Sequence, residues 1–344
     1  QSAGALDAAH AAWPGWAALL PQERSRLLRA WFELISDARA DLALLMTVEQ
    51  GKPLAEAAGE IDYAASFVEF YAEEAKRPNI ESVTSHLADA EVEVWREPVG
   101  VAGLVTPWNF PAAMITRKAA AALAAGCPVL VHPSKETPFS ALALGELALR
   151  AGLPAGVVNI VTGEAPVVVE PWLEDPRVRA LSFTGSTEVG RLIRHATAGS
   201  GKGLTLELGG KSPYVVFDDA DIDSAIEGLV DAIWFNQGQV CCAGSRLIVQ
   251  EGIAERFHAK LKKRMDKLRI GDPLDKSIDV GAIVNEGQRA QIAEMVERGA
   301  QEGEVYQPPC VLPNQGCFYP PTLITGMSPA AELMQEEIFG PVLV

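Results

Sequence analysis

Two adjacent cysteines, Cys241 and Cys242, lie in the stretch FNQGQVCCAGSR (235–246), among amide, glycine and serine residues rather than in an apolar run. A structural cysteine is usually buried and inert. A nucleophilic cysteine is partly exposed and has a depressed pKa, because the thiolate is the reactive form. The polar surroundings therefore predict that one of these thiols does covalent chemistry, with inert packing as the alternative.

An amide donor for such chemistry is available in TPWNFP (106–111). Asn109 follows Trp108 and lies between two prolines, which stiffen the backbone around it. A carboxamide fixed in this way can donate to a developing oxyanion. The alternative is an asparagine side chain that satisfies a turn.

Two carboxylates stand beside glycine turns. Glu207 precedes the Gly-Gly turn of LELGGKSP (206–213), and its apolar neighbours would raise its pKa and suit it to general-base catalysis. Glu337 precedes the Phe-Gly-Pro turn of EEIFGP (336–341). An ordinary surface or salt-bridged carboxylate is the alternative for each.

The stretch FTGSTEVG (183–190) predicts a strand that meets a helix through Gly185 and Ser186. Glycines let backbone N–H groups approach a phosphate, and a helix N-terminus favours an anion. A bare strand–turn–helix is the alternative, because the full dinucleotide fingerprint is absent. A thiol, an amide donor, a base and a phosphate-type turn together indicate acyl chemistry with a nucleotide.

The composition limits the partners and the compartment. The chain has 344 residues, 48% of them hydrophobic, and a formal net charge of −16, which argues against nucleic acid and anionic membranes as partners. No apolar run is long enough to span a bilayer. Five cysteines without a CxxC pair disfavour a disulfide framework and indicate a reducing compartment, the cytoplasm. No zinc-type spacing occurs, so no metal is expected.

The elements that position these residues follow an α/β pattern. Residues 99–209 alternate strands and helices, which predicts βαβ units and a doubly wound parallel sheet. Helices are expected over 22–51, 59–77 and 253–273, with Pro78 stopping the second, and a strand over 91–101. The chain length favours two lobes.

Taken in order, TPWNFP, FTGSTEVG, LELGGKSP, FNQGQVCCAGSR and EEIFGP resemble the NAD(P)-dependent aldehyde dehydrogenase superfamily, over positions 106 to 341. The resemblance implies the aldehyde dehydrogenase fold, in which a Rossmann-like lobe joins an α/β catalytic lobe and part of a small oligomerisation sheet. It places the NAD(P)-binding domain at 1–79 and 99–209, the oligomerisation strand segment at 80–98, and a C-terminally incomplete catalytic domain at 210–344.

The resemblance also implies roles. Cys241 falls on the nucleophile, Asn109 on the oxyanion donor, Glu207 on the general base and Lys118 on a lysine with a proton-relay role. Cys242 is not the nucleophile by this alignment. The implied reaction is oxidation of an aldehyde to a carboxylic acid through a thiohemiacetal and a thioester. The cofactor-binding positions are Trp108, Gly185, Ser186, Glu337 and Phe339.

The ribose-binding segment departs from the family pattern. Where the family commonly has Lys-Pro-x-Glu, this sequence has His132, Pro133, Ser134 and Lys135. A lysine in place of the glutamate removes repulsion of a 2′-phosphate and adds a cation, whereas loss of the first lysine works the other way. Either NAD or NADP is expected, with a lean to NADP; a solvent-facing Lys135 is the alternative.

PAAMITRK (111–118) resembles the succinate-semialdehyde branch, in which the arginine matching Arg117 binds the substrate carboxylate. That branch has a second arginine where this chain has Phe235, and its redox cysteine is one residue further from the nucleophile. Phe235 therefore leaves open a broad-specificity enzyme for aliphatic or aromatic aldehydes.

The family is longer than this chain, which ends in the apolar stretch FGPVLV and looks truncated. A full-length chain is expected to form a homodimer or homotetramer. A coenzyme-A-acylating relative is disfavoured by Glu207, which would direct water at the thioester. A non-catalytic scaffold with the same fold is the remaining alternative.

Overall fold

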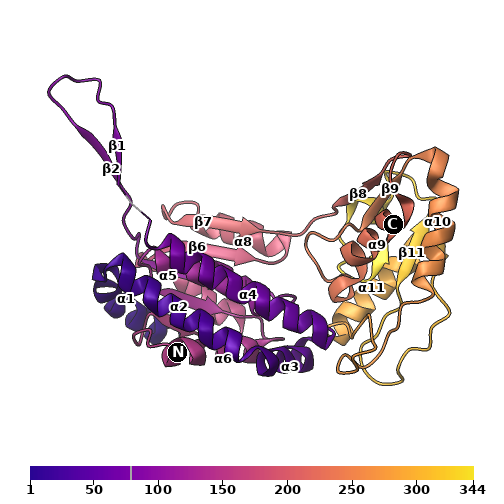
Figure 1. Cartoon of the computed structure of the whole chain (residues 1–344), viewed down its shortest axis with the longest axis horizontal. Coiled ribbons are helices and arrows are strands. Elements are labelled where there is room, and N and C mark those ends of the chain that lie inside the picture. The colour runs from indigo at the N-terminus through magenta and orange to yellow at the C-terminus, as the bar shows by residue number, and fades with distance from the viewer. Residues whose placement is uncertain (78–79) are drawn as a thin grey trace. The chain divides into compact units, whose positions relative to one another are not determined.

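The structure is a computed structural model that describes residues 1–77 and 80–344. The chain divides into two compact units. The first comprises Gln1–Leu42 and Gly59–Glu207, and the second comprises Ala43–Ala58 and Leu208–Val344. Figure 1 shows the elements of both. Pro78 and the predicted domain boundary at residue 79 lie outside the described residues.

A five-stranded sheet in the order β5-β4-β3-β6-β7 forms the centre of the first unit. All of its pairings are parallel. β3 and β4 are buried along their whole length, as expected for central strands covered by helices. The strands are β3 (Val101–Val105), β4 (Val129–His132), β5 (Val158–Ile160), β6 (Val178–Thr184) and β7 (Gly203–Glu207).

The chain first adds β4 and then β5 on one side of β3. It then returns to add β6 and β7 on the other side. Because such crossovers are right-handed, helices that follow opposite directions cover opposite faces of the sheet. This is the predicted doubly wound α/β fold, and it is confirmed. The helices of these crossovers are α5 (Ala113–Ala124), α6 (Pro138–Arg150), α7 (Ala165–Glu174) and α8 (Thr187–Thr197).

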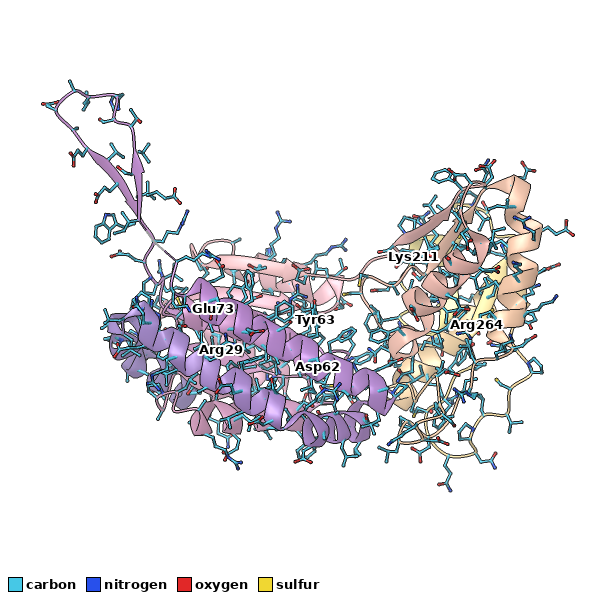
Figure 2. All side chains as sticks on the ribbon, in the orientation of Figure 1. Arg29, Asp62, Tyr63, Glu73, Lys211 and Arg264 are labelled. Carbon is cyan, nitrogen blue, oxygen red and sulfur yellow. The ribbon has the colours of Figure 1, made fainter. Side chains whose placement is uncertain are left out.

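N-terminal helices pack on this unit through buried tryptophans. The indole of Trp16 on α1 (Ser2–Ala18) donates to the carbonyl of Leu123, and that of Trp31 on α2 (Pro21–Asp37) donates to Leu144. Arg29 on α2 forms ion pairs with Glu69 and Glu73 of α4 (Leu54–Glu74) (Figure 2). Exposed ion pairs contribute little to the stability of the fold. The buried, hydrogen-bonded indoles therefore contribute more than the ion pairs to holding these helices on the unit.

An antiparallel hairpin of β1 (Ile80–Val83) and β2 (Val92–Trp95) lies within the predicted segment 80–98. All residues of both strands are exposed. The predicted strand over 91–101 is wrong in extent, because Pro98 and Gly100, with φ +128°, separate β2 from β3.

The second unit contains a parallel pair of strands and a three-stranded sheet in the order β10-β11-β12. Trp234, Phe257 and Leu229 are among the fully buried side chains of its core. Its strands are β8 (Pro213–Val216), β9 (Arg246–Val249), β10 (Glu304–Tyr306), β11 (Thr322–Thr325) and β12 (Val342–Leu343). Its helices are α9 (Ile222–Trp234), α10 (Glu251–Met265), α11 (Glu286–Gly299), α12 (Glu332–Gln335) and the 3₁₀ segment η1 (Phe235–Gly238).

Several predicted helices differ from the observed ones. The helix expected over 22–51 is divided at Ala38, whose ψ of 9° ends α2 before α3 (Arg39–Gln50) begins. The helix expected over 253–273 ends at Met265. α1 and α7 were not predicted because each has an internal proline, Pro14 and Pro171, where the pattern indicates a break.

The two units do not coincide with the predicted domains. Ala43–Ala58 belongs to the second unit, although it lies inside the range predicted for the cofactor-binding domain. The functions assigned to the domains remain predictions. Within the described part of the chain, no helix is both long and apolar enough to cross a bilayer.

Candidate functional site

The sheet of the first unit brings two predicted turns to one edge. β3 and β6 are neighbours, yet the chain leaves them in opposite directions, which makes their carboxyl ends the topological switch point. Ligands of doubly wound sheets bind outside such a point. Trp108 and Asn109 follow β3, and Gly185 and Ser186 follow β6. Asn109 is 4% exposed, so its carboxamide is held within the protein.

The turn after β6 is open to solvent. Ser186 is the N-cap of α8, and its hydroxyl accepts the Val189 N–H at 3.3 Å. The Gly185 N–H donates to the Glu207 carbonyl at 3.1 Å. A Cβ on Gly185 would lie 2.5 Å from the ring of Phe183, so the position requires glycine. The exposed N-terminus of α8 therefore fits an anionic group such as a pyrophosphate.

Lys118 joins α5 to β6. Its Nζ donates to Ser182 Oγ at 2.8 Å. Burial lowers the pKa of Lys118 to about 8, against the opposing effect of the Glu207 carboxylate. A lysine in this condition exchanges a proton near neutral pH more readily than an exposed one.

Glu207 is the last residue of β7 and is exposed, although Leu206 and Leu208 beside it are apolar. β7 is an edge strand whose exposed and half-buried residues alternate, and Glu207 shares the exposed set with Gly203 and Thr205. An exposed carboxylate is accessible to water.

The ribose-binding candidates occupy different environments. His132 ends β4, is buried, and lies 2.9 Å through Nδ1 from the Val161 carbonyl. The Ser134 hydroxyl accepts the Glu136 N–H at 3.2 Å, and Lys135 is exposed. Of the three, Lys135 is the one whose charge is presented to solvent.

Arg117 is exposed on α5, with its guanidinium carbon 5.2 Å from the ring centroid of Phe67. Its Nη1 lies 4.0 Å from the Met114 sulfur. Among the residues that the structure describes, no carboxylate forms an ion pair with Arg117. The guanidinium charge is therefore free to bind an anion.

Three motifs distant in the sequence meet in the second unit. A Cβ on Gly238 would lie 2.0 Å from the Gly340 carbonyl oxygen, and the Trp234 indole donates to the Pro341 carbonyl at 3.2 Å. A Cβ on Gly209 would lie 2.0 Å from Glu337 Oε2. Gly238 thus lets the cysteine segment approach the backbone of the EEIFGP turn, and Gly209 leaves room for the Glu337 side chain.

The two cysteines follow η1, and both are exposed. The pKa of Cys241 is raised, first by partial desolvation of its sulfur and then by Cys242, with a further contribution from Glu337. A nucleophilic cysteine is expected to have a depressed pKa, whereas the pKa of the Cys241 thiol is raised in the protein without bound ligands. Amide and glycine neighbours leave room around the sulfur but supply no positive charge.

Glu337 retains an unsatisfied acceptor. Its Oε1 is buried and has no hydrogen-bond partner among the residues that the structure describes, whereas Gly210 contributes a backbone hydrogen bond to the carboxylate. Burial raises the pKa of Glu337, and the nearby Lys211 opposes that rise. The orphaned oxygen fits a hydroxyl donor such as a ribose. Phe339, two residues on, has φ +55°, and its carbonyl accepts Gln288 Nε2 at 3.2 Å.

Lys211, labelled in Figure 2, was not predicted as a site residue. Its Nζ is buried, and no residue in the described part of the chain forms a hydrogen bond with it. Burial lowers its pKa to about 8, Arg246 lowers it further and Glu337 raises it. A lysine directly after two glycines gives no sequence signal of burial, so this contact needed the fold.

Gln50 and Glu56 were also missed. The backbone N–H of Asn236 donates to Glu56 Oε2 at 2.8 Å, and Gln50 Nε2 donates to Asn236 Oδ1 at 3.1 Å. The sequence carried a weak signal: in α4, Glu56 adjoins the buried Ala57, and Glu60 lies in the buried stripe with Ile61. Phe235, the predicted substrate contact, is exposed at the start of η1.

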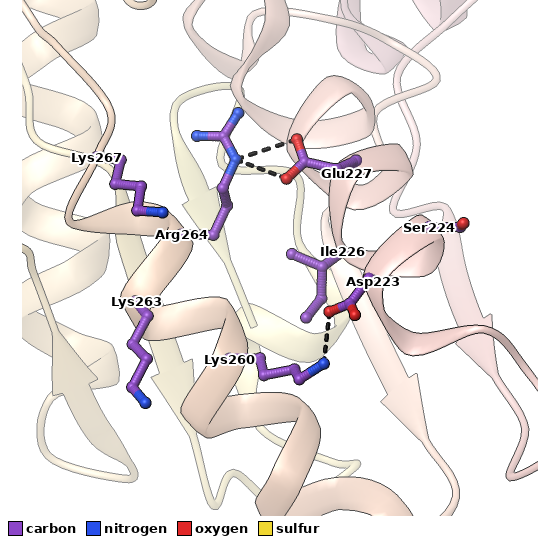
Figure 3. Close-up of a pocket in the computed structure, with 8 residues that line it drawn as sticks. All are labelled: Asp223, Ser224, Ile226, Glu227, Lys260, Lys263, Arg264 and Lys267. Carbon is purple, nitrogen blue, oxygen red and sulfur yellow. Dashed lines mark hydrogen bonds and ion pairs between the residues drawn. The ribbon is translucent and has the colours of Figure 1, made fainter.

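A surface groove of about 720 Å³ lies between α9 and α10 (Figure 3). It is crossed by ion pairs of Lys260 with Asp223 and of Arg264 with Glu227. None of the predicted site residues lines it. Among the described residues, no group of three or more His, Cys, Asp or Glu side chains is arranged to hold a metal ion.

Comparisons with known proteins agree with this arrangement. The sequence matches the profile of the aldehyde dehydrogenase family over residues 1–344. It is 48% identical to a succinate-semialdehyde dehydrogenase [NADP(+)] of Escherichia coli (strain K12), over 99% of this chain and 71% of that protein. It is 47% identical to a glutarate-semialdehyde dehydrogenase of Pseudomonas putida, over 98% of this chain and 70% of that protein. The crystal structure of a succinate-semialdehyde dehydrogenase from Burkholderia pseudomallei superposes with a TM-score of 0.97 at 44% identity, covering 99% of this chain and 71% of that one.

Proposed function

Because the chain belongs to the aldehyde dehydrogenase family, whose members are NAD(P)-dependent oxidoreductases, we propose that it oxidises an aldehyde to a carboxylic acid with Cys241 as the nucleophile. The observation that carries this proposal is the exposed Cys241 at the end of a buried, hydrogen-bonded turn, in the same unit as the orphaned carboxylate oxygen of Glu337. An exposed sulfur on a fixed backbone is what nucleophilic catalysis requires.

The residues present fit a nicotinamide dinucleotide. The N-terminus of α8 at Gly185 and Ser186 would hold the pyrophosphate, and Glu337 Oε1 would accept a ribose hydroxyl. When bound, the oxidised nicotinamide supplies a hydride acceptor, and its positive charge favours the thiolate. Trp108 and Phe339 would line the cofactor.

Each protein group has a defined part in the reaction. The Cys241 sulfur adds to the aldehyde carbon, and the Asn109 carboxamide donates to the oxyanion of the thiohemiacetal. Loss of a hydride from that carbon leaves a thioester on Cys241. Glu207 takes a proton from water, the resulting hydroxide attacks the thioester, and the carboxylic acid leaves as the thiol is restored. We propose a proton-relay role for Lys118, because its Nζ donates to Ser182 Oγ and the Glu207 carboxylate acts on its pKa.

The cofactor is NAD or NADP, and we propose a preference for NADP. Lys135 presents its charge to solvent, where a 2′-phosphate could reach it, whereas His132 is engaged by the Val161 carbonyl. The ratio of kcat/KM for the two cofactors measures the preference. A ratio above one in favour of NADP supports it, and Lys135→Glu should reverse it.

The substrate is proposed to be an aldehyde with a carboxylate at its far end. The related proteins are named for succinate, glutarate and aspartate semialdehydes, which all carry such a group. Arg117 supplies a guanidinium with which no carboxylate of the described residues forms an ion pair. Phe235, exposed ahead of the cysteines, favours the second candidate, a broader aliphatic or aromatic aldehyde.

Steady-state kinetics with succinate semialdehyde, glutarate semialdehyde, hexanal and benzaldehyde distinguishes the two candidates. Arg117→Leu should reduce kcat/KM for both semialdehydes by about tenfold or more, because a carboxylate–guanidinium bond is lost, and leave hexanal unchanged. An unchanged value for the semialdehydes would reject the carboxylate-binding role. A preference of the unaltered protein for benzaldehyde would select the second candidate.

The exposed hairpin of β1 and β2 is proposed as the segment that contacts another copy of the chain. Its exposed side chains include Trp95, Val94 and Val83, which a monomer would leave in water. Light scattering should give a dimer or tetramer, and Trp95→Glu should reduce the mass.

A further inference from the structure

We propose that Glu56, together with Gln50, is a positioning residue for Cys241, because both side chains hold the left-handed turn from which the chain reaches the nucleophile. This inference rests on the proposed function only in naming Cys241 as the nucleophile. The turn and all its contacts lie within the second unit.

The turn is conformationally unusual. Asn236, Gln237 and Gly238 have φ angles of 49°, 56° and 71°, so three consecutive residues occupy the left-handed region. Glycine adopts this conformation readily and asparagine tolerates it, whereas glutamine is disfavoured there. Such a backbone persists only where its surroundings hold it, and it is commonly found at functional sites.

Two side chains from Ala43–Ala58 supply that restraint. Glu56 accepts the backbone N–H of Asn236 at 2.8 Å. Gln50 donates to Asn236 Oδ1 at 3.1 Å and is itself fixed, because its Oε1 accepts the Lys52 N–H at 2.8 Å. Asn236 is fully buried, so its backbone N–H would have no water to bind if Glu56 were removed.

The restraint continues toward the cysteine. Asn236 Nδ2 donates to the Gln239 carbonyl at 3.1 Å, and the Gln239 N–H donates to the Asn236 carbonyl at 3.0 Å. Gln239 Oε1 then accepts the Val284 N–H at 3.1 Å. Gln239 is fully buried and stands two residues before Cys241, so an error in the turn would displace the sulfur.

Stability alone does not account for a carboxylate at position 56. The carboxylate of Glu56 is enclosed by protein, although part of the side chain reaches solvent, and burial raises its pKa to about 7. The charged groups around it are Lys52, which favours the ionised form, and Asp231 and Asp279, which oppose it. An ionised acceptor binds an N–H more strongly than a neutral one, at a cost to the folded state.

Three variants test the role. Glu56→Ala removes the acceptor, Glu56→Gln keeps an acceptor oxygen without the charge, and Glu227→Gln is the matched control, an exposed carboxylate on α9 that pairs with Arg264 instead of the turn. For each, kcat and KM are measured, and limiting iodoacetamide followed by peptide mass spectrometry gives the ratio of alkylation at Cys241 to that at Cys242.

Glu56→Ala should lower kcat about tenfold, the effect of losing a hydrogen bond to a charged group, with KM within about twofold. Its alkylation ratio should fall at least about threefold, because the turn no longer presents one sulfur. Glu56→Gln should restore both values to within about threefold, and Glu227→Gln should change neither. A merely structural role would reduce the folded fraction without altering the ratio in the folded protein.

A folded Glu56→Ala protein whose kcat and alkylation ratio match those of Glu227→Gln would overturn the proposal. Where circular dichroism shows that Glu56→Ala is unfolded, Gln50→Ala provides the same readouts with the carboxylate retained, and an unchanged ratio there rejects the role. The alkylation assay needs no aldehyde. Failure of the unaltered protein to oxidise any aldehyde would therefore reject the proposed function while leaving the positioning role to be judged by the ratio.

Discussion

The turn before Cys241 and the turn at Gly185 and Ser186 differ in how their backbone groups are used. The first has three left-handed residues, buried side chains and hydrogen bonds from Gln50 and Glu56. The second is exposed and has ordinary backbone angles, and within the described ranges 1–77 and 80–344 its one side-chain hydrogen bond is the 3.3 Å cap from Ser186.

This difference corresponds to two kinds of task. A nucleophile must be held to a fraction of an ångström, so its turn is over-determined by contacts. A turn that binds an anion must keep some of its backbone N–H groups available to it; here the Gly185 N–H donates to the Glu207 carbonyl, so the N–H groups at the start of α8 would bind the anion. Substitutions should therefore reduce the rate of reaction at the first turn and cofactor affinity or local stability at the second.

The largest expected effect is at the end of the first turn. Cys241→Ala should reduce kcat by at least about a thousandfold, because the covalent route is lost. Cys242→Ala, its matched control, should retain kcat within about fivefold, since this sulfur is not the attacking atom. The absorbance of reduced nicotinamide during steady-state turnover measures both, and the reverse pattern would exchange the roles of the cysteines.

Glu207, whose carbonyl binds the Gly185 N–H, should show the next largest effect. Glu207→Gln should lower the steady-state rate about a hundredfold or more, because water is no longer activated, while a stoichiometric burst of reduced nicotinamide remains. Rapid-mixing absorbance separates the two phases. Loss of the burst together with the steady-state rate would assign Glu207 to a step before the thioester.

Glu56→Gln should alter the pH dependence of stability. Burial raises the pKa of Glu56 from its ordinary value of 4.5 to about 7 in the folded protein, so the folded state holds its proton more tightly. The cost of ionisation is absent below pH 4.5, grows as pH rises to about 7 and is complete above it, on the order of 3 kcal/mol. The neutral variant avoids this cost.

The stability gained by Glu56→Gln over the unaltered protein should therefore increase between pH 5 and pH 8, as guanidinium chloride unfolding measures it. Its charge neighbours Lys52, Asp231 and Asp279 remain in both proteins, so the comparison isolates position 56. A difference that does not change with pH would show that Glu56 ionises normally.

The smallest effect is expected at the open turn. Ser186→Ala removes the cap of α8 and should lower stability by about 1 kcal/mol, whereas Ser186→Gly should cost only a few tenths. The KM for the cofactor should change by less than about threefold, because the backbone N–H groups remain. A cofactor KM raised more than tenfold by Ser186→Ala would show that the hydroxyl itself binds the dinucleotide.

The sequence patterns predicted the secondary structure and the turns that depend on neighbouring residues. Alternating strands and helices gave the doubly wound sheet, and the glycine and serine at 185 and 186 gave the turn between β6 and α8. They could not give contacts that depend on long-range packing. Glu56 binds Asn236 across 180 positions, and the burial that shifts the pKa of Lys211 and Cys241 arises only when separate motifs pack together.

The most direct test of the account locates the sulfur that reacts. The protein is inactivated stepwise with limiting iodoacetamide, and at each step the residual activity is compared with the alkylated fraction of each of the five cysteines by peptide mass spectrometry. Activity should fall in proportion to alkylation of Cys241 alone. Protein fully alkylated at Cys241 that still oxidises aldehydes, or activity lost in proportion to Cys242, would contradict it.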